Sequence, residues 1–295
     1  MHSLADKLAR VRVVLVEPTY DGNLGKVARA MRNFGLTRLV LVGGRADPTS
    51  DEARWYARAE GMAVLGGCCR TKTLVEAIRG CRTVLGTSRR LGRKRGEPQS
   101  PESVLAETAP WRAAWDTAIV FGREAHGLST GELDLCQKLI WIPSDPECPS
   151  LNLSHAVSIT AYVLAKLARE DTGDAPAGAP LEPAPAEQME AMYEHARRVW
   201  LRIGYLLHQN PDAILRRWRR ILARARLTEY DVRVVRALLH QTDWVAGVAE
   251  IPPGGPHDAP PGLFDKHARR DTSAADPVEE DEPRKRPVRP DGGGC

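Results

Sequence analysis

The chain has 295 residues and a formal net charge of +4, from 42 lysines and arginines against 38 acidic residues. This length allows one well-buried core with additional segments, and the mild basic balance is compatible with nucleic acid without indicating it. The six cysteines include no C-x-x-C pair, so neither a zinc site nor a disulfide framework is predicted, and we expect reduced thiols in a cytoplasmic protein. No apolar run approaches the ~18 residues that span a bilayer, and no signal-peptide pattern precedes the first predicted strand. We therefore expect neither a metal nor a membrane partner.

The segment 11–35 begins with a short valine-rich run, 11–16, that predicts a buried strand. The residues that follow favour a turn: Asp21, Gly22, Asn23 and Gly25. A helix is expected next, with Asp21 or Asn23 capping its free amide groups. Its basic residues recur every three positions: Lys26, Arg29 and Arg32. Such a helix start suits an anion, but a crossover helix with a solvated basic face is the plainer interpretation of this segment alone.

Strands and helices alternate through the rest of the first 170 residues. Further strands are expected at 36–42, 63–65, 83–85, 117–121 and 139–142. Further helices are expected at 51–63, 73–79, 100–107, 129–136 and 150–169. The strands are continuous apolar runs, so the sequence predicts an α/β fold in which helices cover both faces of a mostly parallel sheet. Ligands bind such sheets at the carboxyl ends of the strands.

Composition divides the chain into four parts: a globular domain at 1–170, a Pro/Ala-rich linker at 171–186, a basic helical extension at 187–247 and a disordered tail at 248–295. Several arginines surround Trp218 on the middle predicted helix of the extension. These residues could track an RNA backbone and stack a base. A solvated arginine face with Trp218 in the core fits equally well.

Three segments carry a more specific signal when they are taken together. In chain order they are Asn23-x-Gly25-x-x-x-Arg29-x-x-x-x-Phe34-Gly35, then Ile119-Val120-Phe121-Gly122-Arg123-Glu124 with Gly127-Leu128, then Ile142-Pro143 with Ser150-Leu151-Asn152-Leu153-Ser154. Their order and spacing resemble the SPOUT superfamily of RNA methyltransferases, in its TrmH-like branch of ribose 2′-O-methyltransferases, over roughly residues 11–168. Within that branch, the N-terminal segment, Leu85-Gly86-Thr87-Ser88 and His208-Gln209-Asn210-Pro211 resemble the TrmJ type.

The resemblance implies a C-terminal trefoil knot, a homodimer, and transfer of a methyl group from S-adenosylmethionine to the 2′-hydroxyl of tRNA nucleotide 32. It implies that the methyl donor lies against three loops, formed by Thr87, Ser88 and Arg89, by Gly122, and by Ile142, Pro149, Ser150 and Leu151. It also implies a catalytic group of Arg29, Asn23, Glu124 and Asn152, with Arg29 acting across the dimer interface. We expect RNA contacts from Lys26, Arg29, Arg93, Arg123, Arg217 and Arg220.

A guanidinium keeps its proton in nearly all protein settings, so Arg29 is expected to hold a phosphate and stabilise the forming alkoxide rather than act as a base. Glu124 is expected to pair with Arg29 or Arg123, and it is also a candidate proton acceptor. For Asn152, a helix-capping role competes with a catalytic one.

Two other functions stay open on these motifs: methylation of another tRNA position or of ribosomal RNA, and RNA binding without catalysis. An oxidoreductase that binds a dinucleotide is disfavoured, because no predicted strand is followed by G-x-G-x-x-G.

Overall fold

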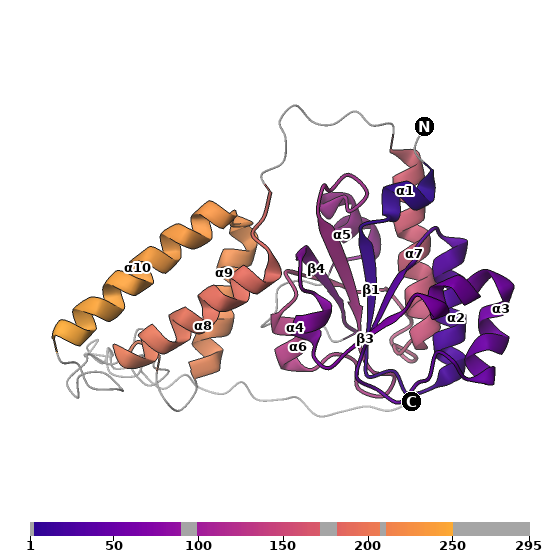
Figure 1. Ribbon diagram of the computed structural model, residues 1–295, viewed down its shortest axis with the longest axis horizontal. Coiled ribbons are helices and arrows are strands. Elements are labelled where there is room, and N and C mark those ends of the chain that lie inside the picture. Colours follow the sequence, from indigo (N-terminus) through magenta and orange to yellow (C-terminus); the bar gives the residue numbers. More distant parts are fainter. Residues whose placement is uncertain (1–2, 90–98, 172–181, 207–210, 250–295) are drawn as a thin grey trace, which may run out of the picture. The chain divides into compact units, whose positions relative to one another are not determined.

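The structure is a computed structural model that describes residues 3–89, 99–171, 182–206 and 211–249. Within these residues, six parallel strands form one sheet in the order β3-β2-β1-β5-β4-β6 (Figure 1). The strands are β1 (Val11–Val16), β2 (Arg38–Val42), β3 (Cys69–Thr71), β4 (Cys81–Thr87), β5 (Asp116–Phe121) and β6 (Lys138–Ile140). The helices around the sheet are α1 (Leu4–Leu8), α2 (Asp21–Asn33), α3 (Asp51–Gly66), α4 (Leu74–Ala77), α5 (Pro101–Thr108), α6 (Thr130–Asp134) and α7 (Leu153–Glu170).

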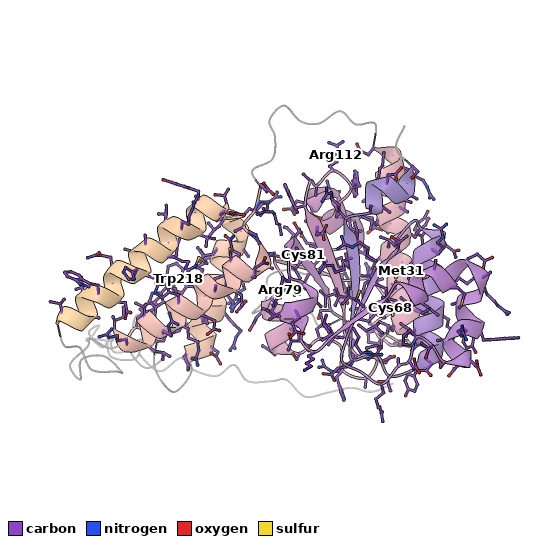
Figure 2. All side chains as sticks on the ribbon, viewed as in Figure 1. Met31, Cys68, Arg79, Cys81, Arg112 and Trp218 are labelled. Atoms are coloured by element: carbon purple, nitrogen blue, oxygen red, sulfur yellow. The ribbon has the colours of Figure 1, made fainter. Side chains whose placement is uncertain are left out.

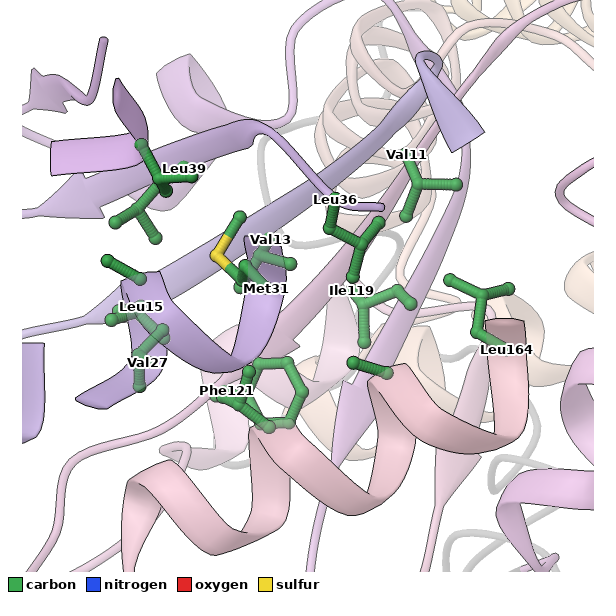
Figure 3. Packing of buried hydrophobic residues seen from close by; sticks show 14 of the residues in the cluster. Val11, Val13, Leu15, Val27, Met31, Leu36, Leu39, Ile119, Phe121 and Leu164 are labelled. Atoms are coloured by element: carbon green, nitrogen blue, oxygen red, sulfur yellow. The ribbon is translucent and has the colours of Figure 1, made fainter. Parts of the chain in front are cut away.

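Alternate residues of β1 enter two separate hydrophobic cores, as the two-residue period of a strand requires. Val13 and Leu15 pack with residues of α2 and α7 on one face, whereas Val14 and Val16 pack with residues of α4 and α6 on the other. Figure 3 shows the first core, with Met31 and Phe121 between the sheet and its helices. The predicted α/β sheet with helices on both faces is therefore confirmed.

The sheet grows outwards from β1 in two directions. β1 pairs with β2 on one side and with β5 on the other, although about a hundred residues separate β5 from β1 in the sequence. Where strand order reverses in this way, the connections leave the sheet on opposite sides and open a crevice at the carboxyl ends of the strands. The ends of β1 and β5 therefore mark where a ligand site is expected.

The predicted turn at 21–25 is wrong, because α2 already begins at Asp21 and Tyr20 occupies the N-cap without a side-chain hydrogen bond. Neither Asp21 nor Asn23 caps the helix. The Asp21 carboxylate instead accepts a hydrogen bond of 2.8 Å from the backbone amide of Asp47. Glycine is required at position 25 by packing rather than by a turn, because a Cβ there would lie within 3.0 Å of the Ala53 carbonyl of α3. A glycine at this position lets α2 and α3 pack backbone to backbone.

The predicted strand at 63–65 is also wrong. These residues continue α3, and Val64 and Leu65 are buried in the first core. α3 is kinked at Arg58, whose backbone has φ 56° and ψ −174°. The strand follows the helix, as β3. The last strand ends at Ile140, so Ile142 lies beyond it.

The helical extension contains α8 (Ala186–Arg202), α9 (Pro211–Ala225) and α10 (Glu229–Val248). Trp218 lies on α9 (Figure 2). Its indole donates a hydrogen bond of 2.9 Å to the Tyr205 hydroxyl, and the centre of its ring lies 5.3 Å from that of Trp200. Trp218 is half-buried and packs against these two residues, while its stacking on an RNA base stays a prediction. α10 begins with the capping box of Thr228 and Asp231 that its sequence indicates.

The contact between α2 and α3 can be tested with Gly25→Ala. We expect this variant to lose about 1–3 kcal/mol of unfolding free energy, because the new methyl group must displace helix backbone rather than a flexible side chain. Urea denaturation followed by circular dichroism measures the change. Gly131→Ala in α6 is the matched control, since a Cβ there meets no atom within 4 Å and the substitution should be neutral or slightly stabilising. Equal stability of the two variants would contradict this account of Gly25.

Candidate active site

A chain of hydrogen bonds joins three elements at the carboxyl edge of the sheet. Asn23 in the first turn of α2 donates to Glu124 Oε1 over 3.2 Å, and its own Oδ1 accepts from Asn152 Nδ2 at 3.1 Å. Glu124 follows β5, and Asn152 caps α7 by accepting from the Ser154 amide at 2.8 Å. Asn23 is only 7% exposed, so both ends of its amide are satisfied within the protein. Three of the four predicted catalytic residues thus meet, and the capping role of Asn152 is confirmed.

The structure does not contain the predicted pairing of Glu124 with Arg29 or Arg123. In the described part of the chain its carboxylate accepts from Asn23 and from the backbone amide of Thr19, whose nitrogen lies 3.3 Å from each carboxylate oxygen. These donors are neutral, and they fix the carboxylate between the end of β1 and the start of α2. The orientation of the Glu124 side chain is therefore set by these two residues.

Beside this chain of hydrogen bonds lies a cavity that gathers residues from the ends of β4, β5 and β6 and from the approach to α7. Its volume is about 120 Å³. All eight residues predicted to contact a methyl donor line it: Thr87, Ser88, Arg89, Gly122, Ile142, Pro149, Ser150 and Leu151. The wall also includes Phe121, Leu128 and Ile140, so an apolar floor lies next to the Glu124 carboxylate. Three loops far apart in sequence therefore converge on one pocket.

The loop after β5 turns back on itself at Gly122. A Cβ on Gly122 would lie within 3.0 Å of the backbone of both Gly127 and Leu128. The Gly127 amide also donates to the Arg123 carbonyl at 2.9 Å, with Gly127 at φ 67°. The missing side chain at Gly122 is thus explained by this close approach of two backbone segments, which shapes one wall of the cavity.

Arg123, in the same loop, forms ion pairs with two carboxylates on neighbouring elements. It donates to both oxygens of Glu17, at 2.8 and 2.6 Å, and to both oxygens of Glu132, at 2.9 and 3.0 Å. Glu17 follows β1 in a left-handed conformation with φ 46°, which an L-residue adopts only at a cost. Arg123 therefore ties the ends of β1 and β5 to α6, and its charge is already met by two carboxylates.

These contacts shift the pKa values of all three groups. The hydrogen bond from Arg123 lowers the pKa of Glu17. Burial opposes ionisation of Glu132, but hydrogen bonds from Arg123 and Ser129 outweigh it and lower its pKa as well. The same bonds to Glu17 and Glu132 raise the pKa of Arg123. Neither carboxylate partner of Arg123 was predicted from the sequence. Glu132 also forms a capping box with Ser129 at the start of α6.

Arg29 and Lys26 lie elsewhere, on the exposed side of α2. No residue of α2 lines the cavity of the same chain, and Arg29 has no hydrogen bond or ion pair among the residues that the structure describes. Arg93 lies outside the described residues. On α9, Arg217 is exposed, while Arg220 is half-buried and donates to the Arg216 carbonyl at 3.3 Å.

Neither a metal site nor a membrane span is found in the described ranges. They contain no group of three or more histidine, cysteine or acidic side chains that could hold a metal ion. No helix within them is long and apolar enough to cross a bilayer.

The Arg123 cluster, formed by Arg123, Glu17 and Glu132, predicts a pH-dependent stability. Glu17 and Glu132 have folded pKa values below their ordinary 4.5, so the unfolded chain binds more protons in acid. The contribution of the cluster is complete above about pH 4.5 and is lost as the pH falls through the lowered values. Arg123→Met should therefore flatten the decline of unfolding free energy below pH 4.5, measured by urea denaturation across a pH series. Arg32→Met, at an exposed position of α2, should keep the wild-type slope; the same slope in all three proteins would refute the cluster's role.

Comparison with known proteins assigns the chain to a family. Residues 10–162 match the SpoU rRNA Methylase family, and residues 187–250 match the C-terminal domain of the tRNA methyltransferase TrmJ. The chain is 36% identical over 251 residues to the tRNA (cytidine/uridine/adenosine-2′-O-)-methyltransferase TrmJ of Pseudomonas aeruginosa, covering 81% of this chain and 96% of that protein. It is 35% identical over 235 residues to the tRNA (cytidine/uridine-2′-O-)-methyltransferase TrmJ of Salmonella typhimurium, covering 79% and 96%.

The fold agrees with the sequence matches. The crystal structure of TrmJ from Z. mobilis superimposes with a TM-score of 0.66 at 31% identity, covering 78% of this chain and 97% of that one. Both parts of the chain, the sheet domain and the helical extension, therefore have counterparts in the same relatives. The chain belongs to the SpoU family of methylases and, within it, to the TrmJ group.

Proposed function

We propose that this chain methylates the ribose 2′-hydroxyl of tRNA, with S-adenosylmethionine as donor and nucleotide 32 of the anticodon loop as target. The observation that carries the proposal is the convergence of three loops on one cavity next to the hydrogen-bonded Glu124, Asn23 and Asn152. Family membership supports tRNA as the substrate, since the relatives are named for tRNA 2′-O methylation.

The cavity suits a molecule with an aromatic base, a methyl-bearing sulfur and a polar end. Its apolar floor of Phe121, Leu128 and Ile140 fits the base. The Glu124 carboxylate at its edge would attract the positively charged sulfur of the donor. A volume of about 120 Å³ is below the roughly 300–1,000 Å³ of typical ligand sites, so in this conformation the cavity encloses only part of the donor. When bound, the donor supplies an electrophilic methyl group for an in-line displacement.

The chain itself must hold the acceptor hydroxyl in line and manage its charge. The Arg29 guanidinium is suited to bind the adjacent phosphate and to stabilise the alkoxide as it forms. The exposed side of α2 lies outside the cavity of the same chain, which supports a homodimer in which Arg29 completes the site of a second copy. Asn23 orients Glu124, which is our candidate for the group that receives the hydroxyl proton.

Three further features belong to the same proposal. The segment that approaches α7 is proposed to pass through a trefoil knot, as the resemblance to SPOUT proteins implies. The chain is proposed to divide into a methyltransferase domain at 1–170, a linker, a helical extension at 187–247 and a tail. Lys26 of α2, with the exposed Arg217 and the half-buried Arg220 of α9, is proposed to contact tRNA phosphates. Arg123 would contribute through the loop that it holds.

The target position is tested by incubating purified protein with S-adenosylmethionine and unmodified tRNA transcripts, then mapping 2′-O-methyl groups by resistance to alkaline cleavage. We expect one modified position, nucleotide 32, because a site of this kind presents a single ribose to the donor. Methylation at another tRNA position, or of ribosomal RNA alone, would replace this target with one of the alternatives. Complete absence of methylation with donor bound would support a non-catalytic RNA-binding role.

The role of Arg29 is tested by Arg29→Ala. Loss of a charge stabiliser of the transition state should lower kcat by about 10²–10³-fold or more, while the affinity for S-adenosylmethionine, measured by calorimetry, stays at the wild-type value. Arg32→Ala is the matched control, because Arg32 is also an exposed cation on α2. Mixing Arg29→Ala with a Gly122→Leu variant, whose cavity wall is blocked, should restore some activity if Arg29 acts in a second copy. Wild-type turnover by Arg29→Ala would remove this residue from the mechanism.

A further inference from the structure

Four exposed residues of α2 and α3 form a surface that the donor cavity does not use. They are Lys26, Trp55, Tyr56 and Arg58, and we call them the aromatic face. The Trp55 side chain is 63% exposed and that of Tyr56 is 38% exposed, which is unusual for large aromatic groups outside an interaction surface. In Figure 1, α3 lies beside α2 on the side away from the strands.

Each ring of the aromatic face is paired with a cation. Lys26 Nζ lies 4.4 Å from the centre of the Tyr56 ring, and Arg58 Cζ lies 4.5 Å from the centre of the Trp55 ring. Cation–π contacts at exposed sites are weak attractions, but they limit the orientations of both partners. The two rings are therefore held in place while much of their surface stays accessible.

The backbone connects the aromatic face to Arg29. Arg58 forms the kink of α3 with φ 56°, a backbone conformation that is strained for a non-glycine residue. Three residues later, Gly61 packs so closely on α2 that a Cβ there would lie 3.0 Å from the Arg29 amide nitrogen. Arg58 and the contact with the Arg29 backbone therefore lie within one turn of each other on α3.

We propose that the aromatic face stacks an unpaired base of the RNA substrate near the target nucleotide, while Lys26 and Arg58 contact its neighbouring phosphates. This inference rests on the proposed function, which assigns Arg29 to the target ribose. Each nucleotide of single-stranded RNA offers a flat base and a phosphate, so rings that alternate with cations match its chemistry. Neither Lys26 nor Arg58 has an acidic partner within 4.0 Å among the described residues, so burial by an apolar protein surface would leave two unpaired charges.

The test measures binding of a fluorescently labelled, unmodified tRNA transcript by anisotropy. Trp55→Ala should raise the Kd for tRNA about 5- to 150-fold, the range for loss of one stacked base. Trp55→Phe keeps a π face and should retain most of the affinity. Trp244→Ala is the matched control, because Trp244 of α10 is 60% exposed and is assigned no contact. Replacing Lys26 and Arg58 together with alanine should lower the slope of log affinity against log salt by about one for each phosphate that these cations neutralise.

Several readouts separate the possible outcomes. Donor affinity and unfolding free energy should be unchanged in Trp55→Ala, and if that variant does not fold, Trp55→Leu, which keeps apolar bulk without a π face, is measured instead. A wild-type protein that methylates tRNA while Trp55→Ala binds it as tightly as Trp244→Ala does would overturn the aromatic face alone. A wild-type protein that neither binds nor methylates tRNA would overturn the proposed function. A change of mass in light scattering for Trp55→Ala would identify the face as a contact between copies, and would also overturn the inference.

Discussion

The hydrogen bonds that run from Glu124 through Asn23 to Asn152 are the constraint on which the site depends. They join the loop after β5, the first turn of α2 and the cap of α7, three segments that come from distant parts of the sequence. Because Asn23 is buried and uses both ends of its amide, none of the three segments can shift alone without leaving a buried polar group unsatisfied. The loop after β5 and the start of α7, which both border the cavity, are thereby fixed to α2.

Close backbone packing does the rest of the positioning. Gly25 brings α2 against α3, Gly61 fixes α3 against the backbone of Arg29, and Gly122 closes the loop that Arg123 holds from the other side. Arg123 pairs with two carboxylates on separate elements, so it stabilises the shape of the loop rather than presenting a free charge to a ligand. The exposed cations of α2, Lys26, Arg29 and Arg32, lie outside the cavity of the same chain.

The sequence predicts well what depends on local patterns. The valine-rich run at 11–16 located β1, the apolar run at 117–121 located β5, and the helix expected at 129–136 corresponds to α6. The eight predicted donor contacts, all of which line the cavity, were identified only through resemblance to a family. No local signal in the sequence shows that the loops after β4 and β6 face each other. Errors arose where tertiary packing overrides propensity. Gly22 and Gly25 are typical of a turn, but in the structure they allow α2 to pack closely against α3. Val64 and Leu65 resemble a strand in sequence, but they are buried residues of α3.

The parallel sheet also determines when the site can exist during synthesis. Asn23 and Asn152 are separated by 129 positions, and Thr19 and Glu124 by 105, so the ribosome must release most of the sheet domain before either bond can form. Contacts of such long range slow folding, since a large loop must close before they contribute any free energy. A nascent chain that ends before α7 has α2 with its basic side but no completed pocket. The growing polypeptide therefore lacks the complete cavity until its α/β part is nearly finished.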